Sequence, residues 1–450
     1  MNRFSVLGVA ALLAAAPVAA SAQTTTSAEA VVEKNTVVVV KEAPKPSPVT
    51  FTPYGFVLVN GYFNDFVGSR NYPFPNACTG GAACEGNILF DVRQSRLGMR
   101  LGFNDTAGWT KAMLSALVEV DFNGGYAGAV ATSSASFYNP VVRLRKAYLD
   151  AVWGTELKFD LRVGQDDRLV SPLRPVSLAY VANPLFQNAG LLHGRAPQLA
   201  LRLEMAPKDG FAFSLAAAAL NPQDNTAGDT TVPASPGQAV DLGAGNRSRM
   251  PDFEGRIGAG IRNGGKKLVD VGVWGGLQKN RFVSPLTDTN VDVNSWIYGG
   301  DLTLNVWMVQ VMGSIYKAAG YDVPGSLGAS QGIAITASRA SPTARYEITG
   351  TNAVPALGGW FQVVVGPSDL VQAYGGWGGT QSPFNAIEGS ILAASSSTRV
   401  QNYMWAAGLI GYAGKNWRFS AEYAKATSWF YTTGKAFTQG QFSINTQLVF

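Results

Sequence analysis

Large apolar side chains alternate with small or charged ones along most of the chain after Thr52. In residues 96–103, every odd position is Leu, Met or Phe, whereas every even position is Arg or Gly. The same split recurs in residues 199–206 and 417–423. Successive side chains of a β-strand point to opposite faces, so this pattern predicts strands with one apolar face and one polar face.

Sixteen alternating runs can each hold one strand. Their approximate spans are 53–66, 88–104, 109–123, 139–152, 156–164, 196–206, 210–220, 251–263, 266–278, 294–305, 307–318, 355–365, 369–378, 400–413, 416–427 and 439–450. The connections alternate between short turns, such as 207–210 and 414–415, and long polar loops. An even strand number with this order of connections is typical of a bacterial outer-membrane barrel. A soluble sandwich would explain the alternation but not the order of turns and loops.

The fold class follows from the needs of the backbone in a membrane. Hydrocarbon offers no partner to N–H and C=O groups, so strands cross it only when their sheet closes on itself. We therefore predict an all-β fold, a closed antiparallel transmembrane β-barrel of about 16 strands with short periplasmic turns and long extracellular loops. Aromatic residues near the strand ends suit the interfacial girdles of such a barrel: Trp109, Trp153, Trp296, Trp360, Trp417 and Tyr423.

The chain divides into a signal peptide, an arm and the barrel. Residues 1–22 are predicted to be the signal peptide, because Arg3 precedes an apolar stretch and Ala20-Ser21-Ala22 forms a small-residue cleavage site. Residues 23–50 are predicted to form a periplasmic arm and linker, which three prolines between 44 and 48 hold extended. The Val-rich stretch at 37–40 fits either a strand that packs with other copies or part of a loose tether. Residues 51–450 are predicted to form the transmembrane barrel.

Two cysteines stand close together in a Gly-rich stretch. Export places Cys78 and Cys84 in an oxidising compartment, which predicts a disulfide between them. Closing so short a loop stabilises the fold by only about 2 kcal/mol. The spacing matches no metal site, so we expect neither a metal nor a cofactor.

Parity places a set of arginines on the lumen side, and we predict that these residues line the pore and bind anions: Arg96, Arg100, Arg143, Arg145, Arg162, Arg202, Arg256 and Arg262. Guanidinium groups raise the local concentration of anions and hold carboxylates or phosphates through two hydrogen bonds. Rings of such side chains are a known basis of anion pores. Asp160, Glu204 and Glu254 share the same faces, so the charges could instead pair with one another and fill space.

Lys146 departs from this pattern. It shares the parity of Val142, Leu144 and Tyr148, which assigns it to the lipid face. A cation at the membrane midplane costs roughly 2 to 4 kcal/mol. We therefore expect Lys146 to lie near an interface or to face a neighbouring subunit.

The connection at residues 165–192 joins the fifth and sixth predicted strands. We predict that it narrows the pore as a constriction loop, with Asp166, Asp167, Arg168 and Arg174 as its charged residues. Three prolines make it semi-rigid. A loop of this kind could also lie over the mouth of the barrel or on its surface.

Several short motifs carry a family resemblance. They are Tyr54-Gly55-Phe56-Val57, Ser95-Arg96-Leu97-Gly98, the stretches 142–148, 163–165 and 194–199, and the terminal Phe450. The chain resembles Gram-negative outer-membrane porins, in particular the DcaP-like and phosphate-selective trimeric porin group. The resemblance implies a sixteen-stranded barrel in the bacterial outer membrane that assembles as a homotrimer. In that group an N-terminal extension can help trimerisation, but the Val-rich and Pro-rich arm here lacks a heptad pattern.

These features together predict a porin for passive diffusion of small hydrophilic solutes. The arginines favour anions such as carboxylates and phosphate, and the expected partners are outer-membrane lipid, further copies of the chain and small polar or anionic solutes. A non-selective or sugar-type channel and a mainly structural, anchoring barrel are the alternatives. No enzyme is expected, because the one histidine, His193, lies in a loop without the context of a catalytic base. A basic pI near 9.0 could suit nucleic acid, but the arginines alternate along membrane strands and the compartment is wrong, so no nucleic-acid partner is expected.

Overall fold

The computed structural model describes most of the barrel. The described residues are 49–66, 71–78, 80, 84–103, 111–124, 140–187, 189–222, 243–284, 287, 289–321, 323, 332–339, 346–366, 370–390 and 398–450. They belong to the second of two compact units, Ser47–Phe450. The predicted signal peptide, nearly all of the predicted arm and the predicted girdle residue Trp109 lie outside them and stay predictions. Among the described residues, no helix is long and apolar enough to span a membrane.

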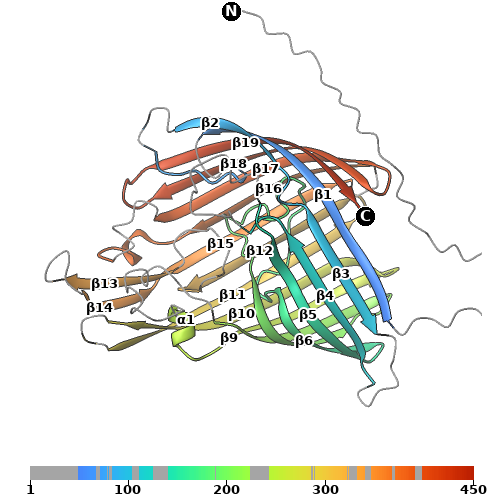
Figure 1. The fold of residues 1–450 in the computed structure, drawn as a ribbon, viewed down its shortest axis with the longest axis horizontal. Helices are drawn as coiled ribbons and strands as arrows, with labels where there is room; N and C mark the ends of the chain where they lie inside the picture. Colours follow the sequence, from blue (N-terminus) through green and yellow to red (C-terminus); the bar gives the residue numbers. More distant parts are fainter. Residues whose placement is uncertain are drawn as a thin grey trace, which may run out of the picture. The chain divides into compact units, whose positions relative to one another are not determined.

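The described part of the chain is mostly strand, with very little helix (Figure 1). The strands are β1 (Val49–Phe66), β2 (Glu85–Asp91), β3 (Arg96–Phe103), β4 (Met113–Asp121), β5 (Arg143–Trp153), β6 (Leu157–Asp167), β7 (Arg195–Met205), β8 (Gly210–Leu220), β9 (Asp252–Asn263), β10 (Lys266–Val283), β11 (Asn290–Val306), β12 (Val309–Ala319), β13 (Ile333–Arg339), β14 (Tyr346–Ala353), β15 (Pro355–Val365), β16 (Val371–Gln381), β17 (Arg399–Ala413), β18 (Trp417–Phe430) and β19 (Ala436–Val449). Two short helical segments, α1 (Ala244–Arg247) and η4 (Phe384–Ala386), lie in connections at the long-loop end.

The main sheet is antiparallel and closed. Its last strand, β19, pairs with β1 from Phe56↔Val449 to Asn64↔Gln441. The other edge of β1 pairs with β2 near one end and with β3 near the other, so these two short strands together occupy one position in the barrel. The sheet therefore has sixteen positions, which confirms the predicted fold class. The second predicted strand, 88–104, is interrupted at residues 92–95.

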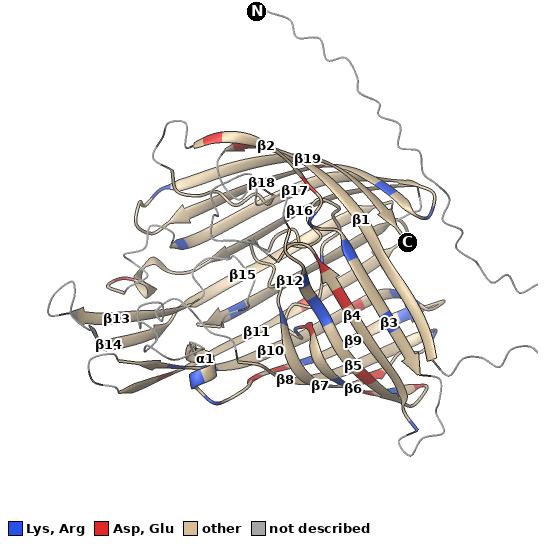
Figure 2. Cartoon of the chain, in the orientation of Figure 1, with Lys and Arg blue, Asp and Glu red and all other residues tan. Residues whose placement is uncertain are grey.

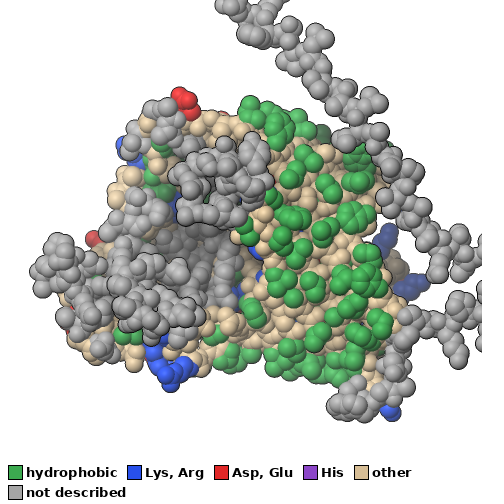
Figure 3. Space-filling model, in the orientation of Figure 1, with side chains coloured by type: hydrophobic (Ala, Val, Ile, Leu, Met, Phe, Trp, Pro, Cys, Tyr) green, Lys and Arg blue, Asp and Glu red, His purple; other side chains and the backbone are tan. Residues whose placement is uncertain are grey.

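The alternation of side chains along each strand determines which residues face the membrane and which face the lumen. On β18 the odd residues Trp417 and Phe419 are exposed, whereas the even residues Ser420, Glu422 and Ala424 are buried. Large apolar side chains cover the outer face of β1 and β3–β6 (Figure 3). A closed sheet with an apolar outer face satisfies the two demands of hydrocarbon, since no backbone edge and little polar surface remain exposed to it.

A β-bulge overturns the prediction for Lys146. In the β4–β5 pair, Val120 faces Leu144 but Glu119 faces Lys146, so Arg145 is an extra residue on β5. An extra residue reverses the parity of everything after it. Lys146 and Tyr148 therefore turn into the lumen, and the expected lipid or subunit contact of Lys146 is wrong.

Two further features differ from the predicted pattern. Trp360 faces inward and is buried, so it does not belong to an aromatic girdle. The loop between the predicted strands 307–318 and 355–365 contains an additional hairpin, in which β13 pairs only with β14. The hairpin has its own small core, where Ile333 and Ile335 pack with Phe282 and Val293 of the long strands β10 and β11.

Candidate functional site

The connection between β6 and β7, residues 168–194, runs through the inside of the barrel. It contacts inward side chains of strands that lie far apart around the circumference, including β1, β9, β15 and β18. We call this segment the inner loop. Of the four charged residues predicted from sequence, Asp166 and Asp167 end β6, and Arg168 and Arg174 lie in the first part of the inner loop. The position of the inner loop leaves only part of the lumen open.

The first anchor of the inner loop is Glu254 on β9. Its carboxylate accepts hydrogen bonds from Arg168 Nε (2.6 Å), the Leu169 backbone N–H (2.7 Å) and Tyr321 Oη (2.8 Å). The Arg168–Glu254 pair is almost completely shielded from water. Charge-assisted bonds of this kind are roughly twice as strong as neutral ones, so they fix the start of the inner loop to the wall.

The second anchor is Glu422 on β18, on another part of the wall. It accepts hydrogen bonds from Ser177 Oγ (2.5 Å), the Leu178 backbone N–H (2.9 Å) and the Ala179 backbone N–H (3.0 Å). Tyr374 Oη donates a further bond of 2.5 Å. Within the described residues no Lys, Arg or His lies within ion-pair distance of Glu422. Ser420 Oγ and the Asn445 amide also donate to it, so uncharged donors compensate this buried carboxylate.

Two glutamines also hold the inner loop, on either side of the second anchor. Gln94, in the interruption between β2 and β3, accepts bonds from the N–H groups of Val181 (2.9 Å) and Ala182 (2.7 Å) and donates to the Ala179 carbonyl (2.7 Å). Gln362 on β15 bonds both the N–H (2.7 Å) and the carbonyl (2.8 Å) of Val176. The interruption at 92–95 therefore positions the side-chain amide of Gln94 against the backbone of the inner loop.

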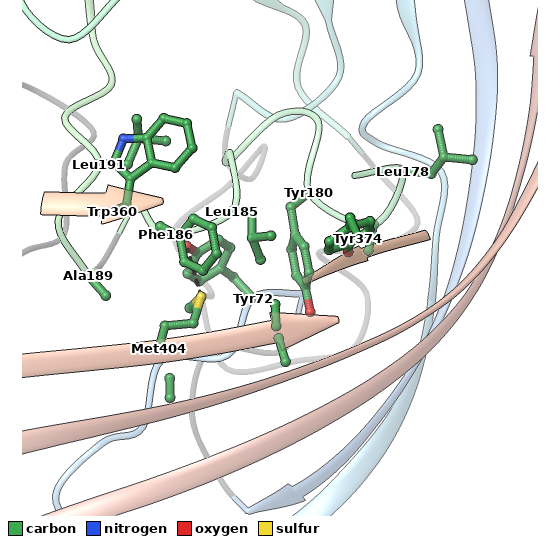
Figure 4. Packing of buried hydrophobic residues seen from close by; sticks show 14 of the residues in the cluster. Tyr72, Leu178, Tyr180, Leu185, Phe186, Ala189, Leu191, Trp360, Tyr374 and Met404 are labelled. Atoms are coloured by element: carbon green, nitrogen blue, oxygen red, sulfur yellow. Dashed lines mark hydrogen bonds between the residues drawn. The ribbon is translucent and has the colours of Figure 1, made fainter. Parts of the chain in front are cut away.

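Apolar side chains of the inner loop pack inside the barrel (Figure 4). Phe186 stacks on Trp360 of β15 with ring centroids 5.9 Å apart. Tyr180 meets Tyr72 edge to face at 5.4 Å, and both belong to the same cluster as Met404 of β17. This cluster fills the part of the lumen next to β1, β12 and β15–β18.

The wall beside this cluster is polar but mainly uncharged. We call it the amide wall, and it consists of the inward residues Asn60, Asn64, Gln439, Gln441, Ser443, Asn445 and Gln447 on β1 and β19. These side chains bond one another, as in the 2.7 Å contact between Asn60 Nδ2 and Asn445 Oδ1. They also hold the inner loop, since Tyr180 Oη donates to Gln441 at 2.8 Å.

The opposite region carries the charges, and we call it the charged wall. Lys, Arg, Asp and Glu concentrate on β3–β6 and β9, while β15, β16 and β19 carry none (Figure 2). Seven of the eight predicted arginines contact carboxylates there: Arg96–Glu119 (3.6 Å), Arg143–Asp121 (2.7 Å), Arg145–Glu119 (2.9 Å), Arg162–Asp150 (2.6 Å), Arg202–Asp166 (3.3 Å), Arg256–Asp301 (2.7 Å) and Arg262–Glu204 (3.5 Å). Arg100 has no carboxylate within ion-pair distance among the described residues.

Lys146 lies at the centre of the charged wall. Its ammonium is 2.8 Å from both Asp166 and Asp167, and Asp167 is 3.8 Å from Arg174 of the inner loop. Arg162 pairs with Asp166 and lies over the ring of Tyr148 at 4.0 Å from its centroid. The bulge thus brings a cation and an aromatic ring into a charge network that links the wall to the inner loop.

Two hollows remain open along the charged wall. The first, of about 450 Å³, is lined by five cationic side chains and two carboxylates: Arg96, Arg100, Arg145, Lys146, Arg174, Glu119 and Asp167. The second, of about 410 Å³, is lined by Arg202, Glu204, Arg256, Arg262 and Asp270 among others. Lys146 and Asp167 border both hollows, so the two spaces adjoin at this ion pair.

His193 lies near the end of the inner loop and lines the first hollow. Its Nε2 is 3.1 Å from Arg195 Nη1. Because a guanidinium can only donate, Nε2 is the acceptor and the ring proton resides on Nδ1. Burial and the neighbouring guanidiniums, Arg174 foremost, hold the pKa of His193 well below its usual value. The ring is therefore neutral at physiological pH.

The two cysteines are joined, Cys78 to Cys84, next to a segment that enters the barrel. Tyr72 Oη donates to the Pro184 carbonyl of the inner loop (3.1 Å), and Gln439 Oε1 accepts from the Phe74 N–H (2.9 Å). The guanidinium of Arg399 lies 3.7 Å from the centroid of the Phe74 ring. The segment that precedes the disulfide thus helps to hold the inner loop in the barrel.

Sequence reasoning missed the residues that fasten the inner loop. Gln94, Gln362 and Glu422 were not singled out, and Glu254 was taken only as a lumen acid. One signal in the sequence does point to Glu422, which is an inward acid on a strand whose inward neighbours Ser420 and Ala424 are uncharged. An inward carboxylate without a nearby cation needs several hydrogen-bond donors, and a loop backbone can supply them.

A closed sixteen-position barrel with a loop folded into its lumen defines the fold of an outer-membrane porin. The outer membrane channel DcaP of Acinetobacter baumannii has this fold, with a TM-score of 0.63 and 14% identity over 90% of this chain and 98% of that one. The trimer form of OmpT of Vibrio cholerae (TM-score 0.50, 11% identity, 89% and 99% coverage) and OprB of Pseudomonas putida (0.50, 9%, 89% and 94%) are also similar. No family model and no curated protein matches the chain. The closed barrel, its apolar outer face and this shared fold place the protein in the bacterial outer membrane.

Proposed function

We propose that the protein is a porin whose water-filled path follows the charged wall and favours small anions such as carboxylates and phosphate. One observation carries the proposal: the hollow beside the inner loop is lined by five cationic side chains and only two carboxylates. The inner loop supports it by filling the space next to the amide wall, so that solutes must pass beside the arginines.

The expected mechanism is electrostatic and needs no chemical step. Cations in a narrow space between low-dielectric walls raise the local concentration of anions, and guanidiniums bind oxyanions through paired hydrogen bonds. Carboxylates such as Glu119 and Asp121 hold Arg145 in a fixed orientation. Because these acids also cancel part of the charge, we expect weak binding and mild selectivity, which allow an anion to leave as readily as it enters. We propose no catalytic activity.

Reversal potentials across a KCl gradient test the proposal. In a planar bilayer we expect conducting channels whose reversal potential has the sign of chloride preference. A clear preference for potassium would contradict the anion proposal, and a silent bilayer after verified insertion would contradict the porin itself.

The ion pairs support a second candidate, a channel without charge preference. Arg143, Arg162 and Arg256 each lie within 2.7 Å of a carboxylate, so their charges are largely neutralised. Such a lumen would pass small polar solutes with little discrimination. The same bilayer experiment separates the two candidates, because this channel would reverse near zero potential.

We also propose that the protein assembles as a homotrimer. The support is the trimer form of the similar Vibrio cholerae protein and the apolar outer face of the barrel. Light scattering of the protein in detergent, corrected for bound detergent, should give three times the mass of one chain. A mass of one chain under mild detergent conditions would contradict the trimer.

A further inference from the structure

An apolar groove crosses the outer face of β9, β10 and β11. It is shallow and open, with a volume of about 530 Å³, and its floor includes Gly255 and Gly275, which lie directly opposite each other in the β9–β10 pair. On the same outward faces, Ile257 and Val273 are more than half exposed, so the absence of side chains at the two glycines lowers the surface locally. The result is a slot in the part of the barrel that faces hydrocarbon.

The sides of the groove are large and apolar. Phe253 and Leu277 border it, and Leu277 is 62% exposed. Trp296 and Tyr298 of β11 form the other side as a stacked pair, with centroids 5.4 Å apart and planes inclined by 9°. Rigid ring faces and a smooth glycine floor suit a straight hydrocarbon chain, which gains dispersion contacts on three sides.

Cations continue the same outward faces above the groove, toward the end of the barrel that carries the long loops. Lys279 and Arg281 follow Leu277 at the next two outward positions of β10, and both bond Asp292, at 2.8 Å and 2.6 Å. Lys317 of β12 is exposed and lies directly opposite Tyr298 in the strand register. Lys279 and Arg281 therefore stand beyond one end of the groove and share Asp292, whereas Lys317 stands at its side.

A cation on the lipid face is costly near the bilayer midplane but nearly free of cost at the interface, where lipid phosphates are available to it. We propose that this groove binds one phosphorylated lipid of the leaflet at the long-loop end, with an acyl chain in the glycine-floored slot and the phosphorylated headgroup along the cationic rim, from Lys317 at the side of the groove to Lys279 and Arg281 beyond its end. The site is continuous with the apolar face that contacts lipid. It does not depend on the solute preference of the pore.

A second copy of the chain fits this surface less well. The outer face of the barrel is predominantly apolar, so a neighbouring barrel would cover Lys317 without offering it an anion. Covering a cation in this way carries a large desolvation cost, whereas a lipid phosphate compensates it. The lipid is therefore the occupant that matches both the groove and the charges.

Native mass spectrometry of the detergent-purified protein tests the site. Phosphatidylglycerol and phosphatidylcholine with identical acyl chains serve as probes, since they differ in net charge. The variants are the triple change Lys279→Ala, Arg281→Ala and Lys317→Ala, and the single change Gly255→Leu. The groove can take this side chain, because a Cβ at Gly255 would meet nothing closer than the Ala216 carbonyl at 3.7 Å. Lys425→Ala, an exposed lysine on β18, is the matched control.

We expect the wild-type protein and the Lys425→Ala control to retain phosphatidylglycerol in preference to phosphatidylcholine. Each groove variant should retain it less, with the triple change lowering the bound fraction by about fivefold or more. Equal retention in all proteins would overturn the proposal. Loss of phosphatidylglycerol binding in the triple variant but not in Gly255→Leu would also overturn it. Binding would then depend on surface charge alone, with no acyl chain bound in the groove. Bilayer conductance equal to that of the wild-type protein verifies that each variant is folded.

Discussion

The charged wall and the amide wall line the same lumen, but burying them costs different amounts of free energy. The amides and hydroxyls of β1 and β19 satisfy one another, so the inner loop can cover them with little loss of hydrogen bonding. The arginines and acids of β3–β9 pair as well, yet removing charges from water costs much more than removing bonded amides. The inner loop therefore packs on the neutral wall, and the water stays with the charges.

Removing the Glu422 carboxylate should have the largest effect on this division. Glu422→Gln replaces one of the two acceptor oxygens by a donor, and these oxygens accept from Ser177 on one side and from the N–H groups of Leu178 and Ala179 on the other. Hydrogen bonds to a charged group contribute about 1.5 to 3 kcal/mol each, so docking of the inner loop should weaken by roughly 3 kcal/mol. In single-channel records we expect larger and noisier openings.

Glu204→Gln is the control for this change. Glu204 lies on the charged wall, has a half-exposed carboxylate and makes only a 3.5 Å contact with Arg262. Its loss should leave the size and noise of the openings unchanged. Identical behaviour of the two variants would show that Glu422 does not hold the inner loop.

Replacing Arg143 and Arg145 together by Ala should have the next largest effect, on ion preference. The change removes both guanidinium partners of Asp121 and the nearer of the two guanidinium partners of Glu119. The reversal potential in a KCl gradient should move toward potassium preference. Adding Glu119→Gln and Asp121→Asn should restore most of the original value, because the charge balance is restored. No shift in the double variant would place these arginines away from the path.

The fold could be predicted from sequence because alternation is local. Each strand reveals its own apolar face, and for 210–220 and 355–365 the predicted bounds coincide with β8 and β15. The orientation of Lys146 could not be predicted. The extra residue at Arg145 exchanges the inward and outward positions of the strand after it, and no residue type in the sequence signals this bulge. The docking of the inner loop could not be predicted either. It depends on Gln94 and Glu422, which lie far apart in the sequence and both contact Ala179 of the inner loop only in the closed barrel. The eight arginines were found by parity, but their pairing depends on register.

Acid should affect the wild-type protein more than a His193→Asn variant. Burial lowers the pKa of His193 in the folded state, so the released loop binds a proton more readily than the docked one. Docking should therefore weaken as the pH falls through the usual histidine pKa of about 6.5. Thermal unfolding and channel noise, compared at pH 7.5 and pH 5, measure this difference. An equal response in both proteins would mean that the acid sensitivity arises elsewhere.

The smallest effect on ion flow is expected from the amide wall. Gln441→Leu removes the acceptor for Tyr180 Oη and the donor to Asn64, so stability should fall by about 1 to 3 kcal/mol. Ion preference should not change, because Gln441 is covered by the inner loop. A shifted reversal potential in this variant would indicate that water reaches the amide wall.

Cysteine accessibility tests most directly whether the open path follows the charged wall. The only two cysteines of the chain are joined, which gives a background without free thiols. Arg100→Cys and Ser443→Cys place a thiol on the charged wall and on the amide wall. With an anionic methanethiosulfonate reagent in the bath, we predict that current through Arg100→Cys channels changes within seconds to minutes, while Ser443→Cys channels do not respond. Rapid modification of Ser443→Cys with Arg100→Cys unaffected would contradict this division of the lumen.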